Sequence, residues 1–122
     1  MYTGWELDRD TRDLLLLMFP PLFPDVIAHH ITLTYGVGAD AVPPPNVEAD
    51  VVGVASGDGV QALVVSVDGS VVRPDKGIFH ITWSIDRSAG RKPVDAKLLL
   101  DKHVWRTLSP YPIFVRPRVF RT

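Results

Sequence analysis

The feature that most constrains the fold is a repeated strand pattern. The tripeptide His-Ile-Thr occurs at residues 30–32 and again at residues 80–82, and each copy lies in a stretch where polar and apolar side chains alternate. Because successive side chains of a β-strand point to opposite faces, this alternation predicts strands over residues 28–35 and 78–85. Each strand then has one face for a core and one face that presents an imidazole and a hydroxyl group.

The two faces of each strand have different expected roles. The polar rows are expected to comprise His30, Thr32 and Thr34 in the first strand, and His80, Thr82 and Ser84 in the second. The apolar rows, expected to face a core, comprise Ile31, Leu33 and Tyr35 in the first strand, and Phe79, Ile81, Trp83 and Ile85 in the second. His29 precedes the first row by one residue, so it is expected on the opposite face, in a core or capping role.

The rest of the chain predicts a few helices and strands separated by glycine and proline. Residues 57–59, Gly-Asp-Gly, tolerate positive φ and predict a hairpin turn. Pro117 predicts that the last strand lies at a sheet edge. The expected elements are a strand over 2–7, a helix from Asp8 or Asp10 to Met18, strands over 47–56 and 60–67, a short helix from Pro93 or Asp95 to about His103, and a strand over 113–121. These elements predict an α+β fold with predominantly antiparallel strands.

Length and composition favour one domain over residues 1–122, because 122 residues of which 46% are hydrophobic suit a single modest core. The chain has no cysteine, which excludes disulfides, thiolate metal sites and a cysteine nucleophile. The apolar run at residues 14–19 is shorter than a membrane span and follows acidic residues. We therefore expect a cytoplasmic protein with no membrane association and no obligate protein partner.

Charge is distributed unevenly along the chain. Residues 1–85 hold 4 basic and 11 acidic side chains, whereas residues 86–122 hold 9 basic and 3 acidic side chains. The basic segment could attract a phosphate-bearing ligand, or it could simply balance the acidic segment at the surface. A long nucleic-acid track usually needs more positive charge, so a small nucleotide, a cyclic nucleotide or one RNA end is the expected partner.

Two histidines that face one cleft can divide acid and base work. One imidazole removes a proton from an attacking hydroxyl or water, and the other protonates the leaving oxygen. The hydroxyls of Thr32 and Thr82 would donate hydrogen bonds to phosphate oxygens. The candidate catalytic residues are therefore His30, His80, Thr32 and Thr82, and this chemistry requires no metal and no cofactor.

The two strand motifs, His30-Ile31-Thr32-Leu33 and His80-Ile81-Thr82-Trp83, resemble the signature of the 2H phosphoesterase superfamily. The resemblance implies a compact bilobed α+β fold, with mostly antiparallel sheets around a cleft and about two helices. It also implies a metal-independent phosphodiesterase that acts on a nucleotide or RNA phosphodiester, such as a 2′,3′-cyclic phosphate, or on a cyclic oligonucleotide messenger. The opening Tyr2-Thr3-Gly4 is similar to small RNA-repair-like and phage-type members, which makes Thr3 a candidate substrate contact.

Other residues have weaker claims to the site. Tyr2 and Tyr111 could stack on a base, although ordinary packing explains both. His103 has no visible partner, and no His-Glu-x-x-His pattern or carboxylate cluster suggests zinc. Two alternatives to an enzyme stay open, namely a nucleotide-binding module without turnover and a structural domain in which the repeated tripeptide is a coincidence.

Overall fold

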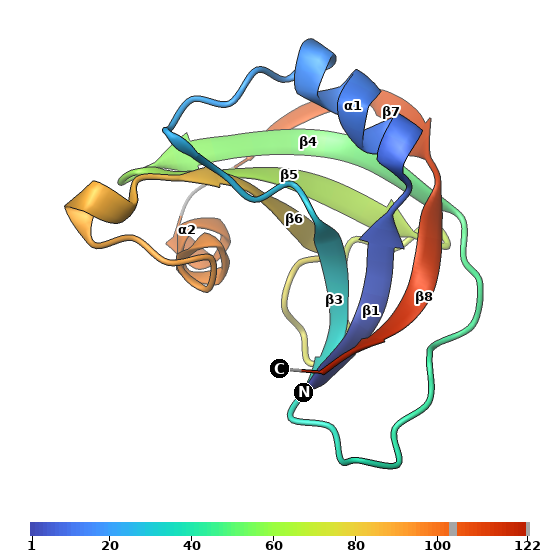
Figure 1. Ribbon diagram of the computed structural model, residues 1–122. Coiled ribbons are helices and arrows are strands. Elements are labelled where there is room, and N and C mark those ends of the chain that lie inside the picture. Colours follow the sequence, from blue (N-terminus) through green and yellow to red (C-terminus); the bar gives the residue numbers. More distant parts are fainter. Residues whose placement is uncertain (103–104, 122) are drawn as a thin grey trace.

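The computed structural model describes residues 1–102 and 105–121, and these form two helices and eight strands in two sheets (Figure 1). The elements are β1 (Tyr2–Leu7), α1 (Arg9–Met18), β2 (Asp25–Val26), β3 (His30–Tyr35), β4 (Ala49–Gly57), β5 (Val60–Val67), β6 (His80–Ile85), the short 3₁₀ helix η1 (Arg87–Ala89), α2 (Asp95–Lys102), β7 (Arg106–Ile113) and β8 (Val115–Phe120). The strand pairs are antiparallel, so the predicted α+β class is confirmed. The end of the second predicted helix, at His103, lies outside the described residues.

The two sheets have the strand orders β3-β1-β8 and β2-β6-β5-β4-β7. Strands β7 and β8 are separated by Phe114 alone, so one extended segment passes from the edge of the larger sheet to the edge of the smaller one. Pro117 lies on edge strand β8, as predicted. Residues 106–112 of β7 were not predicted as a strand, although an edge strand tolerates Pro110 and Pro112, which lack an amide hydrogen.

Local sequence signals explain several boundaries. The Asp8 carboxylate caps α1 by accepting hydrogen bonds from the amides of Asp10 and Thr11, and Pro20 follows the helix end. Asp58 and Gly59 both have positive φ, 52° and 78°, as in the primed turns that join hairpin strands. The predicted first helix and hairpin are therefore confirmed.

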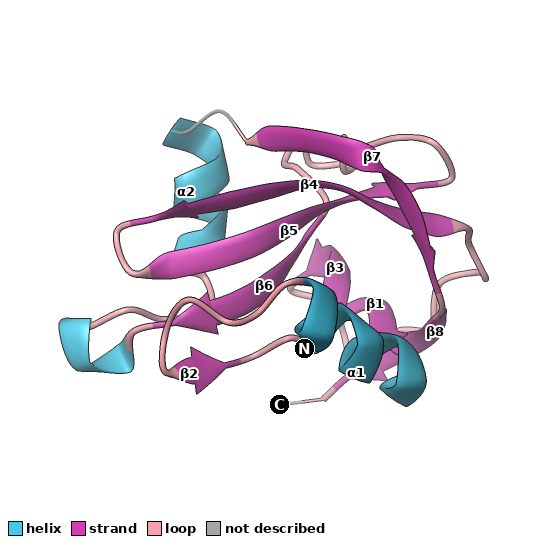
Figure 2. Cartoon of the chain, turned by 90° about the horizontal axis from the view of Figure 1, so that it is seen from above, coloured by secondary structure: helices cyan, strands magenta, loops and turns pink. Residues whose placement is uncertain are grey.

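A shared core joins both sheets. Its members are buried apolar side chains from the small sheet, the large sheet and α1, among them Trp5, Ile31, Leu15, Val51, Leu63 and Trp83. A second cluster lies on the other face of the large sheet, where α2 packs against β4 and β5 (Figure 2). Every residue of β5 is buried, since this central strand is covered on both faces. No helix in the described part of the chain is long and apolar enough to cross a membrane.

The chain crosses between the sheets just before the first His-Ile-Thr copy. The amides of Ile27 and Ala28 donate to the carbonyls of Trp83 and Thr82 at 2.9 and 3.0 Å, which adds this segment to β6. One residue later, the carbonyl of His29 accepts from the amide of Leu7 on β1 at 2.9 Å. Ala28 makes the bend with a φ of 44°. This crossing brings β3 next to β6, although their histidines are 50 residues apart.

Each motif strand contains an irregularity that changes its faces. In the β1–β3 pair Thr32 lies opposite Gly4 and Thr34 lies opposite Thr3, so Leu33 has no partner. In the β5–β6 pair Thr82 lies opposite Ala62 and Ser84 opposite Gln61, which leaves Trp83 without one. Both strands therefore have a β-bulge directly after His-Ile-Thr, and a bulge reverses the alternation beyond it.

The bulges correct four expected positions. Thr34 and Ser84 do not extend the polar rows, and Ser84 is fully buried, with its hydroxyl 2.5 Å from Oε1 of Gln61. Tyr35 was expected in the core but is 49% exposed. Ile85 joins the cluster under α2, away from Ile81 and Trp83, which lie in the shared core. The alternation of the sequence therefore predicts the face of each side chain correctly only up to the bulged residue.

Candidate active site

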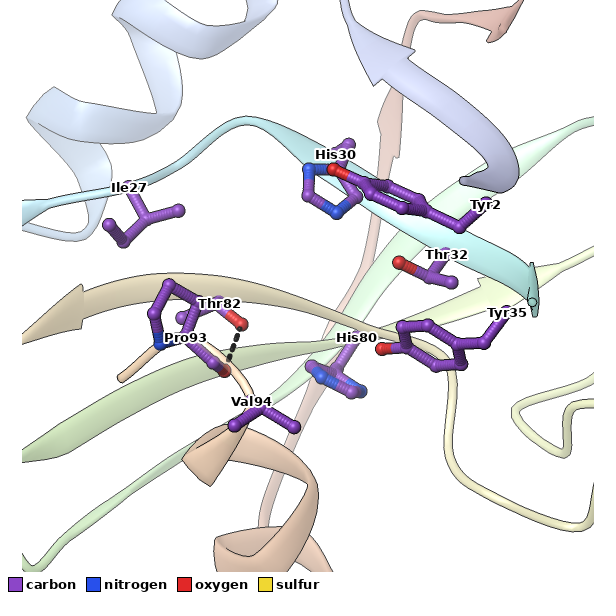
Figure 3. A pocket seen from close by; sticks show the side chains of 9 residues that line it. All are labelled: Tyr2, Ile27, His30, Thr32, Tyr35, His80, Thr82, Pro93 and Val94. Carbon is purple, nitrogen blue, oxygen red and sulfur yellow. Dashed lines mark hydrogen bonds between the residues drawn. The ribbon is translucent and has the colours of Figure 1, made fainter. Parts of the chain in front are cut away.

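The two His-Ile-Thr copies meet in one pocket. Figure 3 shows His30 and Thr32 on one wall and His80 and Thr82 on the facing wall. The pocket has a volume of about 170 Å³ and is lined by Tyr2, Ile27, His30, Thr32, Tyr35, His80, Thr82, Pro93 and Val94. All four residues proposed from sequence as catalytic thus lie together, on strands of different sheets.

His30 belongs to a chain of hydrogen bonds that reaches the surface. Its Nδ1 lies 3.1 Å from Nδ1 of His29, and Nε2 of His29 lies 3.2 Å from a carboxylate oxygen of Glu6. The other Glu6 oxygen accepts from Arg118 at 3.0 Å. In the neutral His29 tautomer whose Nε2–H donates to Glu6, Nδ1 of His29 accepts a hydrogen bond from Nδ1–H of His30. This arrangement leaves Nε2 of His30 with a free lone pair.

The position of His29 differs from the expectation. Its side chain is half exposed and lies beside the His30 ring, with centroids 5.3 Å apart, instead of pointing into a core. The simple alternation fails because His29 precedes β3, directly after the positive-φ bend at Ala28. The contacts of His29 with the His30 ring and the Glu6 carboxylate were therefore missed from sequence, since Glu6 is remote along the chain.

Aromatic rings surround His30. The centroid of its ring lies 5.1 Å from that of Tyr2 and 4.9 Å from that of Phe120. Burial, together with smaller contributions from the charges of His29 and His80, lowers the pKa of His30 to about 4. His30 is accordingly neutral near pH 7, as a general base must be.

His80 is more deeply buried, with 8% of its surface exposed. Its Nδ1 lies 2.7 Å from the carbonyl oxygen of Ile78, so Nδ1–H donates there and Nε2 is left for chemistry. Burial lowers the pKa of His80, whereas the hydrogen bond to Ile78 favours the protonated ring. The two histidines thus differ, because only His80 has a backbone acceptor that stabilises an imidazolium.

The two threonine hydroxyls have different resting partners. Oγ1 of Thr82 donates to the carbonyl oxygen of Pro93 at 3.2 Å, drawn as a dashed line in Figure 3. Oγ1 of Thr32 makes no hydrogen bond to the described residues. A ligand oxygen can therefore take the Thr32 hydroxyl directly, whereas Thr82 must first rotate away from Pro93.

The remaining candidates fall in different places. Tyr2 lines the pocket with the histidines. Thr3 does not, because it is buried beside Thr34 and Val119. Tyr111 lies on β7 at a separate hollow next to α1, so the structure does not bring it to the histidines. His103 lies outside the described residues. Tyr35, Ile27, Pro93 and Val94 line the pocket but were missed. The bulge places Tyr35 and the sheet crossing places Ile27, whereas Pro93 and Val94 come from the segment before α2, which contacts Thr82.

The basic C-terminal residues do not line the pocket, in which no lysine or arginine takes part. Arg116 and Arg118 pair instead with Asp8 and Glu6, at 3.6 and 3.0 Å. These contacts indicate that Arg116 and Arg118 balance the negative charge of the acidic N-terminal half. Among residues 1–102 and 105–121, no group of three or more histidine, aspartate or glutamate side chains could hold a metal ion.

Comparisons of the chain with protein-family models, with curated proteins and with solved structures gave no match. The residues and geometry of the pocket are therefore the basis for a functional assignment.

Proposed function

We propose that this protein is a metal-independent phosphodiesterase that cleaves a nucleotide or RNA phosphodiester by two-histidine acid–base catalysis. The observation that carries the proposal is the meeting of two His-x-Thr pairs in one pocket. The resemblance of these motifs to the 2H phosphoesterase signature supports it, as does the position of the two strands in different sheets on either side of the pocket.

The hydrogen bonds favour specific roles for the histidines. Nε2 of His30 takes a proton from the attacking water, whose oxygen forms the new bond to phosphorus. His80 gives its Nε2 proton to the ribose oxygen as the old phosphorus–oxygen bond breaks. This role requires the protonated ring, which the hydrogen bond to Ile78 and the negative charge of a bound phosphate favour against the burial that lowers its pKa. From a 2′,3′-cyclic phosphate the product is a phosphomonoester and a free hydroxyl, so atoms and protons balance.

The threonines hold the phosphate between the two rings. Each hydroxyl can donate to a non-bridging oxygen, where negative charge grows in the transition state. Pocket size favours a small reacting unit, because about 170 Å³ suits a phosphodiester and an adjoining sugar better than a whole cyclic oligonucleotide. A cyclic oligonucleotide would have to bind with most of its surface outside.

Mass spectrometry of reaction products, with chelator present, tests this proposal. The panel comprises 2′,3′-cyclic mononucleotides, cyclic ADP-ribose phosphates, cyclic di- and trinucleotides and 2′,5′-linked dimers. We expect turnover of one class by the wild-type protein and loss of turnover in His30→Ala and His80→Ala. Tight binding without any product would favour the alternative of a non-catalytic nucleotide-binding module.

The bulge in β3 supplies a matched control. Thr32 and Thr34 have identical side chains two residues apart, but only Thr32 lines the pocket. We expect Thr32→Ala to lower kcat about 10- to 100-fold, since mutations that remove one stabilising donor have effects of about this size or larger. Thr34→Ala should behave as wild type. Equal effects of the two substitutions would argue against phosphate binding at Thr32.

A further inference from the structure

A buried arginine lies beside the pocket without enough partners. Arg73 is in the segment that joins β5 to β6, and only 2% of its surface is exposed. Arginine is almost never buried this deeply unless its charge and its donors are paired. Its environment therefore needs an explanation beyond packing.

The contacts of Arg73 satisfy one donor nitrogen of three. Nε donates to the Asp75 carboxylate at 2.9 Å. Nη1 and Nη2 are buried and make no hydrogen bond to any described residue. Gly77 packs so closely that an added Cβ would lie 2.6 Å from Nη2. The guanidinium is thus held in place by Asp75 and Gly77, with two donor nitrogens unused.

Tyr35 connects this arginine to the pocket. Cζ of Arg73 lies 5.3 Å from the centroid of the Tyr35 ring, and the same ring lines the pocket beside His30 and Thr32. The positive charge of Arg73 also acts on His80, where it disfavours protonation. Arg73 therefore lies behind Tyr35, close to the acid–base pair.

Tyr35 is suited to uncover the guanidinium. The side chain is half exposed and is the last residue of β3, followed by Gly36 with a φ of 67°. Rotation of the ring toward solvent would expose Nη1 and Nη2, which form a planar fork that matches two oxygens of a phosphate. Lysine could not supply this paired geometry.

We propose that Arg73, covered by Tyr35, is an anion subsite that binds a second phosphate of the substrate, on the 5′ side of the nucleotide whose phosphodiester is cleaved. This inference rests on the function proposed above and specifies its substrate class as nucleotides with at least two phosphate groups. The scissile phosphate stays with the two threonines, since Arg73 does not line the pocket itself.

Two ligands that differ by one phosphate test the subsite. They are adenosine 2′,3′-cyclic phosphate and the same compound with a 5′-phosphate. For the wild-type protein we expect kcat/KM for the 5′-phosphorylated ligand to be at least about 10-fold higher, the range of a charge-assisted bidentate pair. In Arg73→Gln this preference should disappear, so that kcat/KM becomes equal for the two ligands, whatever change the loss of positive charge near His80 makes to both. Arg73→Lys should recover only part of the preference.

A control arginine and a binding assay complete the design. Arg116→Gln removes an exposed arginine that pairs with Asp8 outside the pocket, and it should keep the full preference. Calorimetric Kd values for both ligands, measured with His80→Ala, report the subsite without turnover. If Arg73→Gln does not fold, the wild-type comparison decides, because equal kcat/KM and equal Kd for the two ligands would overturn the subsite.

The outcomes separate the two proposals. Turnover of both ligands with equal efficiency leaves the phosphodiesterase standing and removes the subsite. An equal fold-loss of kcat/KM for both ligands in Arg73→Gln would leave the preference intact and likewise reject a second-phosphate site. No turnover of either ligand, combined with tighter binding of the 5′-phosphorylated one, would refute hydrolysis of 2′,3′-cyclic mononucleotides and keep the anion subsite.

Discussion

Acidification should destabilise this protein through His30 in a way that one substitution can isolate. The pKa of His30 is lowered from 6.5 to about 4, chiefly by burial among Tyr2 and Phe120. Between these two values the unfolded chain binds a proton that the folded protein excludes. The free energy of unfolding therefore rises with pH and falls when the solution is acidified.

The size of the effect follows from the pKa difference. Each pH unit between the two pKa values is worth about 1.4 kcal/mol, so the change from about pH 7 to about pH 4.5 should cost about 2 to 3 kcal/mol. Burial also lowers the pKa of His80, which adds a loss in the same direction. Comparison with a His30 variant is needed to separate the two contributions.

His30→Phe keeps an aromatic ring against Tyr2 and Phe120 but cannot titrate. Urea unfolding followed by the fluorescence of the buried Trp5 and Trp83 would give the free energy of unfolding at each pH. The wild-type protein should lose about 2 to 3 kcal/mol more than the variant over this range. Parallel curves for the two proteins would refute a strongly lowered His30 pKa and, with it, the burial argument for a neutral base.

Three further substitutions test separate parts of the structure. Glu6→Gln should lower kcat about 10-fold and change the shape of the pH–rate profile, because its carboxylate orients His29 against His30; an unchanged profile would contradict the positioning role. Gly4→Ala should reduce the free energy of unfolding by about 1 to 3 kcal/mol in urea titrations, since the added Cβ collides with the carbonyl oxygen of Ile31. Asp8→Ala should cost about 1 kcal/mol by thermal unfolding through loss of the α1 cap, and a shift in melting temperature below one degree would argue against that cap.

Elements with strong local signals were predictable. Helix α1 begins after a capping aspartate and ends before Pro20, and the β4–β5 hairpin turns at Asp58 and Gly59, where positive φ is tolerated. Strand β7 and the short β2 were missed. Their existence depends on pairing with β4 and β6, which are remote along the chain, and no local pattern reports such pairing.

The candidate site was predictable in part for the same reason. The choice of His30, Thr32, His80 and Thr82 needed only the two-residue period of a strand and the repeated tripeptide. Tyr35 was assigned to the wrong face, because a bulge at Leu33 depends on the register with β1. Thr3 and Tyr111 were placed on resemblance and residue type, neither of which reports orientation.

The sequence by itself determined the α+β class, the first helix, the central hairpin and the His30–Thr32 and His80–Thr82 pairs on their strands, because each depends on residues close together in the chain. Only the tertiary structure decided that the rows share a pocket, that His29 and Glu6 support His30, and that Arg73 lies behind Tyr35. The physical reason is that these contacts require the crossing at Ala28 and the two bulges, which depend on pairing between strands far apart in sequence.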